Sequence, residues 1–488
     1  MDELELQSIE LEKDAVIKEK KFFQIDFLKA LMIFLVIFDH YVYWDVKNEI
    51  GVALWERISI PVFLVIMGFN MGHSFRAQGV ESLKQLYSWD YFKKKLLRYV
   101  VPFLILYGAS TFIGLFMYGF DPIAMYYYQF YPSHGVINLF NFILPFWGPG
   151  NWFIPVLFQS ILIVPFLYWC FSKKPVISLI LTFVVEIVMQ ILVFFLVAQT
   201  FASWEEYYAS LRLYSLFSNS ILYYLSAVGL GMWFSQNHGI FHKRNIFMWI
   251  LFPISLVYII AYQFFDFRIM IDGLRFIRGD YNFLVFPYSA FLVLLALKFL
   301  PKKSNSWISK TMTLISKSTY HILLTQILGY GMVAAWWGSH YGMYLPFEPS
   351  DILDLIALWV LFIWFGILWY KIDRQKDYRI RILYYLNFFI IFSSILLLTF
   401  WLQGFWVPIP LSLIIIYAIG LLIRHIAVKK EATEPLSLKR VAVWTGFLVL
   451  CYFSAILQVT IFSPSDFWIL LVPIGVYLFL TLYYTPAD

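Results

Sequence analysis

The sequence has few charged residues and almost no cysteine. Charged side chains make up 14% of the 488 residues and hydrophobic ones 61%, and the mean hydropathy is +0.74. A soluble globular chain of this length does not have that composition, so the sequence predicts a polytopic membrane protein. The two cysteines, Cys170 and Cys451, both lie in hydrophobic segments, which argues against a disulfide framework.

Several enzyme signatures are also missing. The chain has no P-loop, no HExxH, no GxSxG and no Cys/His set with metal-binding spacing, so we expect no metal. The acidic start MDELELQSIELEKDAV lacks the basic residues and cleavage site of a signal peptide, and we expect the first apolar segment to be retained. The positions of the cations explain the net charge of +6, so no nucleic-acid partner is expected.

Long apolar segments fill most of the chain. Segments near 20 residues suit helices that cross a bilayer and are too long for the strands of an outer-membrane barrel. We expect fourteen spans, at about 23–44, 55–73, 99–118, 152–171, 176–199, 213–234, 245–265, 281–300, 318–337, 353–370, 382–402, 405–423, 441–461 and 466–484. With the N-terminus inside, 30 of the 36 Lys and Arg residues fall on the cytosolic side, as the positive-inside rule requires. The sequence therefore predicts an all-α membrane protein with both termini in the cytosol.

Loops and charge suggest how the chain is divided. The outer loop at 119–150 is aromatic and free of Lys and Arg, which suits either stacking on sugar rings or an interfacial aromatic belt. A charged segment at 371–381 follows the tenth span, and the later spans have almost no polar groups inside the membrane. We therefore expect a cytosolic tail (1–21), a ten-span unit (22–370) and four accessory helices (371–488).

The first predicted span carries ionisable residues, namely Asp26, Lys29, Asp39 and His40. Such groups are costly in a bilayer, so they usually face a protein interior or a water-filled cavity. Lys29 and His40 are 11 residues apart, which on a helix is about 16 Å along the axis and within about 20° of one face.

Two interpretations of this span stay open. Lys29 can snorkel to the inner interface beside Asp26, with Asp39 and His40 at the outer interface. Alternatively, His40 is the general base for a hydroxyl, a role that suits a group titrating near neutral pH. Adjacent helical residues point about 100° apart, which argues against a direct pair between Asp39 and His40.

A basic cluster lies at the start of the third span, at Lys93, Lys94, Lys95 and Arg98. Ordinary positive-inside topology explains it, and so does a site for a phosphorylated cytosolic cofactor, because clustered cations bind phosphate. Arg76, after the second span, is a further candidate for that cofactor.

Other polar residues in apolar segments are weaker candidates. Asn70 is either a pocket residue or a boundary residue, and Glu186 makes either a structural hydrogen bond or part of a site. His321 lies near an inner edge, which favours an interfacial role. Gly68 and Gly72 are four residues apart, which suits close helix packing.

Taken in order, these segments resemble the integral-membrane acyltransferase-3 family. Asp26-Phe27-Leu28-Lys29, ten residues and then His40 resemble its first span, Asp-x-Leu-Arg followed by His. Residues 61–70 (PVFLVIMGFN) resemble its FFxxSGF signature, with Met67 at the usual Ser. Residues 94–102 (KKLLRYVVP) resemble RRxxRxxP, with one extra residue before the proline.

Three later segments extend the resemblance over about 22–370. Residues 149–165 look like the family's WYL…P span, and Arg212 and Gly229 lie about where its R…G span places them. Residues 319–326 (TYHILLTQ) resemble SYxIYLxH, with Gln326 in place of the common His.

The resemblance implies a multi-pass plasma-membrane enzyme that transfers an acyl group, most often acetyl, from cytosolic acyl-CoA. The acceptor would be a hydroxyl of a surface polysaccharide, glycan or glycolipid. His40 takes the position of the catalytic His and Lys29 that of the first-span Arg, with Asp26 beside it. Lys94, Lys95 and Arg98 take the positions of the inner basic cluster.

Two departures bear on activity. Lysine in place of arginine at position 29 loses a bidentate fork. Gln326 is neither acid nor base, so the second His is dispensable in this branch or its loss marks altered activity.

Two other classes stay open. A glycan or lipid transporter, such as a flippase, would explain the many spans, and a non-catalytic sensor would explain Met67 and Gln326. Glycan movement without acyl transfer favours the transporter, whereas acyl-CoA binding without turnover favours the sensor. Direct transfer and an acyl relay through His40 both suit the sequence, which carries no signal for the oligomeric state.

Overall fold

The computed structural model describes residues 22–42, 44–80, 82–117, 150, 152–197, 217–271, 274–277, 280–341 and 352–401. The predicted cytosolic tail, Arg212 and the three predicted spans beyond residue 402 lie outside these residues. So does the predicted aromatic loop at 119–150, except for Gly150.

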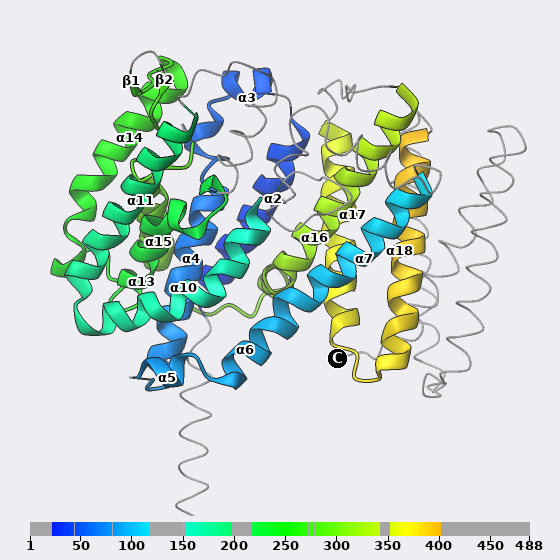
Figure 1. Ribbon diagram of the computed structural model, residues 1–488, viewed down its shortest axis with the longest axis horizontal. Helices are drawn as coiled ribbons and strands as arrows, with labels where there is room; N and C mark the ends of the chain where they lie inside the picture. Colours follow the sequence, from blue (N-terminus) through cyan, green and yellow to red (C-terminus); the bar gives the residue numbers. More distant parts are fainter. Residues whose placement is uncertain are drawn as a thin grey trace, which may run out of the picture.

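Two helices run through the middle of the described part, α2 (Phe23–Tyr41) and α4 (Ser59–Ala77). Figure 1 shows one group of helices on the α4 side and a second group on the α2 side. The first group is α10 (Phe153–Lys173), α11 (Pro175–Val197), α13 (Leu225–Phe234), α14 (Met248–Phe264) and α15 (Phe286–Phe299). The second group is α16 (Trp307–Tyr341), α17 (Ile352–Asp373) and α18 (Tyr378–Trp401).

Short elements lie at the two ends of this bundle. One end holds α5 (Leu83–Leu86) and α6 (Trp89–Lys95), which continues through the π-helical turn η2 (Leu96–Val100) into the slanting helix α7 (Val101–Met117). The opposite end holds α3 (Trp44–Glu49) and the hairpin of β1 (Met270–Ile271) and β2 (Leu274–Arg275) (Figure 1). Single 3₁₀ turns are η1 (Val52–Leu54), η3 (Ile221–Tyr224) and η4 (Lys243–Asn245). The residues predicted to be cytosolic at 83–95 thus lie opposite those predicted to be outside at 44–49 and 270–275.

Each of the first eleven predicted spans coincides with a helical segment. By length and hydropathy, four segments of the described part could cross a membrane: Val52–Ala77, Phe153–Lys173, Pro175–Phe195 and Lys243–Phe264. The α2 helix is as long as α4, but three charged residues interrupt its apolar surface. The small β1–β2 hairpin is a departure from a purely helical chain.

Two predicted spans differ from the structure. The span at 213–234 is not one continuous helix, because a 3₁₀ turn precedes α13. Gln159 Oε1 accepts from the Ser220 hydroxyl and the Ile221 amide at this break, so side chains satisfy donors that a longer helix would pair internally. The span at 318–337 belongs to α16, which begins at Trp307 because no proline or glycine stops the polar turns before it.

Glycines bring α4 and α13 into backbone contact. A Cβ added at Gly68 would lie 2.1 Å from the Val228 carbonyl oxygen, and one at Gly231 would lie 1.9 Å from that of Val65. The prediction that Gly68 serves close packing is confirmed, and Gly72 packs against the side chains of Ser235 and Met232.

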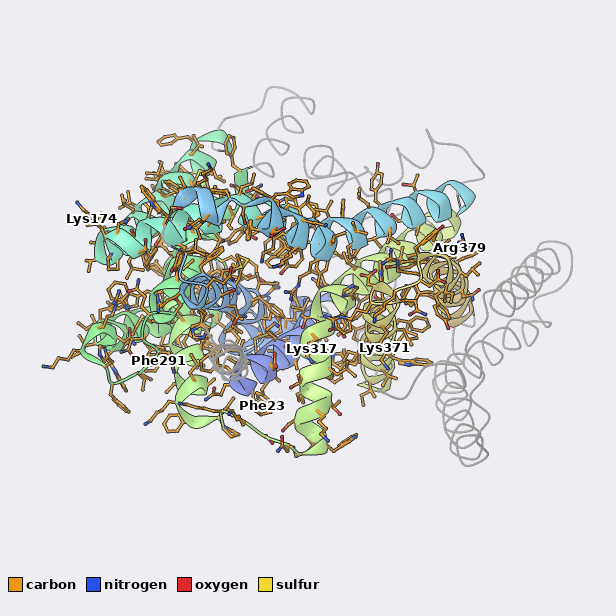
Figure 2. The ribbon with its side chains drawn as sticks, turned by 90° about the horizontal axis from the view of Figure 1, so that it is seen from below. Phe23, Lys174, Phe291, Lys317, Lys371 and Arg379 are labelled. Atoms are coloured by element: carbon orange, nitrogen blue, oxygen red, sulfur yellow. The ribbon has the colours of Figure 1, made fainter. Side chains whose placement is uncertain are left out.

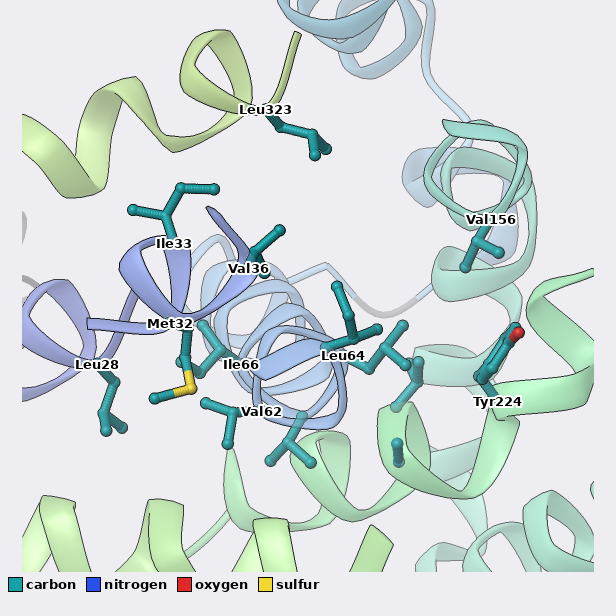
Figure 3. Close-up of a cluster of buried hydrophobic side chains, with 14 of the residues drawn as sticks. Leu28, Met32, Ile33, Val36, Val62, Leu64, Ile66, Val156, Tyr224 and Leu323 are labelled. Carbon is teal, nitrogen blue, oxygen red and sulfur yellow. The ribbon is translucent and has the colours of Figure 1, made fainter. Parts of the chain in front are cut away.

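The other faces of α4 pack in the usual apolar manner. Figure 3 shows Met32 of α2 beside Val62 and Ile66 of α4, in the main cluster of buried side chains.

We expect Gly231→Ala to destabilise the protein by about 1–3 kcal/mol or more, because the new methyl group meets backbone that cannot move aside. The measurement is thermal unfolding of the detergent-solubilised protein. Gly108→Ala in α7 is the matched control, since a Cβ there meets nothing within 4 Å. Equal midpoints for the two variants would contradict the packing argument.

Candidate functional site

The first turn of α2 is fixed by polar contacts. Gln24 donates to the carbonyl oxygens of Leu297 (3.0 Å) and Leu300 (2.9 Å), which end α15. Asp26 accepts from the Ser316 hydroxyl of α16 at 2.7 Å. These bonds set the position of Lys29, one turn further along.

Lys29 lies among cations and an aromatic ring. Its electrostatic neighbours are Asp26, Arg98 and Tyr99. Lys95 Nζ lies 5.6 Å and Arg98 Cζ 5.3 Å from the centre of the Tyr99 ring. We call Lys29, Lys95, Arg98 and Tyr99 the inner cationic cluster. The structure thus brings the first-span lysine next to Arg98 of the basic cluster.

The remaining basic residues lie around this cluster in different ways. Lys93 and Lys94 are exposed on α6, whereas Lys95 is partly buried with Nζ 3.0 Å from Met71 Sδ. Arg76 donates to the Ser235 carbonyl oxygen at 2.5 Å, where it caps the C-terminus of α13. A cation is stabilising at that position, so this contact gives Arg76 a structural role.

The π-helical turn explains the extra residue before Pro102. The Val101 amide donates to the Leu96 carbonyl five residues earlier, so this turn takes one residue more than an α-helical turn. Proline has no amide hydrogen to continue the ladder, which favours such an irregularity just before it. Arg98 and Tyr99 lie inside this turn.

His40 lies at the other end of α2, in its last turn, and its side chain is 12% exposed. The Nδ1 atom contacts Gln326 Nε2 of α16, and the Tyr330 ring packs edge-on at 6.2 Å between centroids. Gly150 closes another side, since a Cβ there would lie 3.2 Å from His40 Cε1. Gln326 therefore touches the imidazole that the resemblance makes catalytic.

The contact with Gln326 can set the tautomer of His40. In the present orientation Gln326 Oε1 is buried and accepts no hydrogen bond. A rotated amide would accept from an Nδ1–H instead and leave Nε2 with the lone pair that a base needs. A glutamine at position 326 can thus do the positioning work of a histidine without being an acid or a base.

Apolar side chains separate the two ends of α2. Ile33 and Val36 share the helix face of Lys29 and His40, and they are 1% and 3% exposed. Figure 3 shows both on the side of α2 where Leu323 of α16 lies. Packed hydrocarbon side chains therefore separate the inner cationic cluster from His40.

One face of α4 becomes more exposed toward its cytosolic end. Phe63 and Met67 are partly buried, whereas Asn70 and Ser74 on the same face are exposed. Asn70 therefore faces open space and not the packed core. Figure 2 looks onto this end of the bundle, with Phe23 at the start of α2 near Lys317 of α16.

An ionic cluster that the sequence did not reveal lies beside His40. Asp39 pairs with Lys47 Nζ (2.7 Å) and Arg57 (3.2 Å), and Arg57 Nε also lies 3.5 Å from Glu56 and 3.8 Å from Asp280. We call these five residues the outer ionic cluster. The one signal in the sequence is that two of the six outer cations, Lys47 and Arg57, follow the first span closely.

Asp39 forms no hydrogen bond with His40. The distance from Asp39 Oδ2 to His40 Nε2 is 3.9 Å, which is too long for one. Helix geometry argues against a direct pair, but the carboxylate lies within ion-pair distance of the imidazole and acts on it through its charge.

Glu186 and His321 are tied into the helix packing. Glu186 accepts from the Ser226 amide (2.9 Å), an unpaired donor in the first turn of α13, and from Gln190 (3.2 Å). His321 is buried and lies 2.6 Å from Asp373, so it joins α16 to α17 and is not interfacial. Within the described ranges, no group of three His, Cys, Asp or Glu side chains could hold a metal ion.

The comparison with protein families decides the class. A family model for an acyltransferase domain, that of the acyltransferase-3 family, matches residues 22–369, from α2 to α17. The chain belongs to the acyltransferase-3 family. It is therefore a membrane acyltransferase. No curated protein and no solved structure matches the chain.

We expect Gln326→Leu to lower acyl transfer by about tenfold or more, because it leaves His40 Nδ1 buried without a partner. Gln326→His keeps a hydrogen-bonding group at this place and should retain most of the activity. The rate with saturating acyl donor measures both variants. Equal rates for the two would show that Gln326 does not position His40.

Proposed function

We propose that this acyltransferase moves an acetyl or related acyl group from cytosolic acyl-CoA to a hydroxyl of a surface sugar, polysaccharide or glycolipid in the plasma membrane. One observation carries the proposal. A single face of α2 holds Lys29 in the inner cationic cluster and His40 eleven residues further, where Gln326 contacts it.

The cationic end suits coenzyme A. Its phosphates would meet exposed Lys93 and Lys94 and then Arg98, because guanidinium and ammonium groups form charge-assisted hydrogen bonds with phosphate. Lys29 and Lys95 lie deeper and would hold groups closer to the thioester. The neutral arm of the cofactor would pass the face of α4 that carries Asn70.

At the other end, His40 would act on the acceptor. Its Nε2 would take the hydroxyl proton while the oxygen attacks the acyl carbonyl. The carbon–sulfur bond breaks, and the proton passes to the leaving thiolate, so that free coenzyme A and an ester result. In the relay version, a nitrogen of His40 carries the acyl group first and the hydroxyl attacks it afterwards.

The contact between Gln326 and His40 bears on the sensor alternative. Gln326 suggested a degenerate site because it is not a titratable group. Its position against Nδ1 supports an orienting role instead, and a site built that way needs one titrating histidine.

His40→Ala should abolish acetyl-CoA-dependent labelling of membrane glycans, because it removes the base. The measurement is transfer of a radiolabelled acetyl group in isolated membranes that contain equal amounts of each variant. The matched control is His242→Ala, an exposed histidine at the start of η4. Unchanged labelling in His40→Ala would overturn the assignment.

Binding of acyl-CoA should weaken at alkaline pH. Burial lowers the pKa of Lys95, with Tyr99 opposing and Arg98 adding to that effect, so Lys95 loses its charge at a lower pH than an ordinary lysine does. Lys95→Arg stays charged and should keep the affinity that the native protein loses, about tenfold between about pH 7 and pH 10. Titration calorimetry with acetyl-CoA measures this. Lys84→Arg, an exposed cytosolic control, should follow the native pH profile.

A further inference from the structure

The outer ionic cluster has one carboxylate more than it has cations. Asp39, Glu56 and Asp280 face Lys47 and Arg57. The five side chains are between 1% and 16% exposed, so little water reaches them. Buried charge is costly unless it is compensated, and one added proton would make the cluster neutral.

Glu56 is the member with the fewest partners. It is fully buried, and neither carboxylate oxygen accepts a hydrogen bond from a residue that the structure describes. Arg57 Nε lies 3.5 Å from its carboxylate. The carboxyl group of Asp39, which pairs with the same arginine, also interacts with Glu56, and Lys47 acts on it through its charge. Two carboxyl groups that meet in this way can form a hydrogen bond only through a proton on one of them.

The donors decide which carboxyl group carries the proton. Asp39 accepts from Lys47 and Arg57, and such donors favour the charged form of a carboxylate. Glu56 has no donor of that kind in the described part of the chain. The other titratable groups there that face the pair are His40, the Tyr281 and Tyr330 phenols and Asp280, and Asp280 is directed at Arg57.

We propose that Glu56 is protonated and donates a hydrogen bond to the Asp39 carboxylate, so that the outer ionic cluster is neutral beside His40. Glu56 is then a positioning residue. It holds the Asp39 charge 3.9 Å from His40 Nε2, where a proton arriving on the imidazole is stabilised. This consequence for catalysis rests on the proposed function, whereas the shared proton does not.

Thermal unfolding against pH tests the shared proton without any substrate. In the unfolded chain Glu56 releases its proton above about pH 4.3, whereas the folded protein retains it, so native stability falls as the pH rises. Glu56→Gln cannot release a proton. Its unfolding temperature should therefore exceed that of the native protein by a margin that grows from about pH 5 to about pH 8.

Asp266→Asn is the matched control, because it removes an exposed carboxylate that pairs with Arg268 outside the cluster. Its unfolding temperature should show no margin over the native protein that grows with pH. A margin for Glu56→Gln that stays constant with pH, or that Asp266→Asn reproduces, would overturn the proposal.

Infrared spectroscopy gives a direct second measurement. The native protein at neutral pH should show the carbonyl stretch of a protonated carboxylic acid, and part of that band should be missing in Glu56→Gln and retained in Asp266→Asn. An unchanged band in Glu56→Gln would mean that Glu56 is ionised. Neither measurement involves acyl transfer, so failure here leaves the proposed function standing, and the His40→Ala experiment tests that function separately.

Kinetics test the positioning role. Glu56→Leu removes the hydrogen bond to Asp39 and should lower kcat by about tenfold or more while leaving the KM for acyl-CoA unchanged. Glu56→Gln can still donate to Asp39 and should recover most of that loss. Equal kcat values for the two variants, or a change in KM alone, would overturn the positioning role.

Discussion

The site depends on the contact between α2 and α16. Ser316 holds Asp26 at the start of α2, and Gln326 touches His40 at its end, so one helix fixes both ends of the other. Between these points the contact is apolar, through Ile33 and Leu323 among others. A shift of α16 along α2 would move the partner of His40 and the neighbours of Lys29 together. The positions of the two ends are therefore coupled through rigid packing.

Most of the helical layout could be predicted from the sequence, and so could the alignment of Lys29 and His40 along one helix. Apolar length and the placement of Lys and Arg locate the helices, because a bilayer constrains both. The period of a helix places Lys29 and His40 on one face. Gln326 could be recognised as a departure from a motif, but its contact with His40 depends on how two distant helices pack. No periodicity in either helix contains that information.

The outer ionic cluster could not be predicted from the sequence, for a related reason. Glu56 and Arg57 lie at the outer edge of the second predicted span, just before α4, and Asp280 is more than 200 residues away. Charged residues at the edge of a span are ordinarily solvated, so a sequence gives no reason to single them out. Only the fold shows that these side chains are buried against one another and against the residue that precedes His40. The π-helical turn could not be predicted either. In the sequence the extra residue before Pro102 is only a mismatch to a motif, and the backbone shows that a π-helical turn accommodates it.

The arrangement separates charge from hydrocarbon in a way that constrains the chemistry. Cations gather at one end of α2, a neutral or singly charged cluster lies at the other, and Ile33 and Val36 lie between them nearly without exposure. Moving a free ion across that interval would cost a large desolvation free energy, because hydrocarbon does not solvate charge. An acyl group is neutral and mostly apolar, so hydrocarbon surroundings do not impose the free-energy cost that they impose on an ion. If the two substrates arrive from opposite sides of the membrane, the group that travels along α2 is the acyl group, and the phosphates and the proton stay at the ends where charged side chains can compensate them.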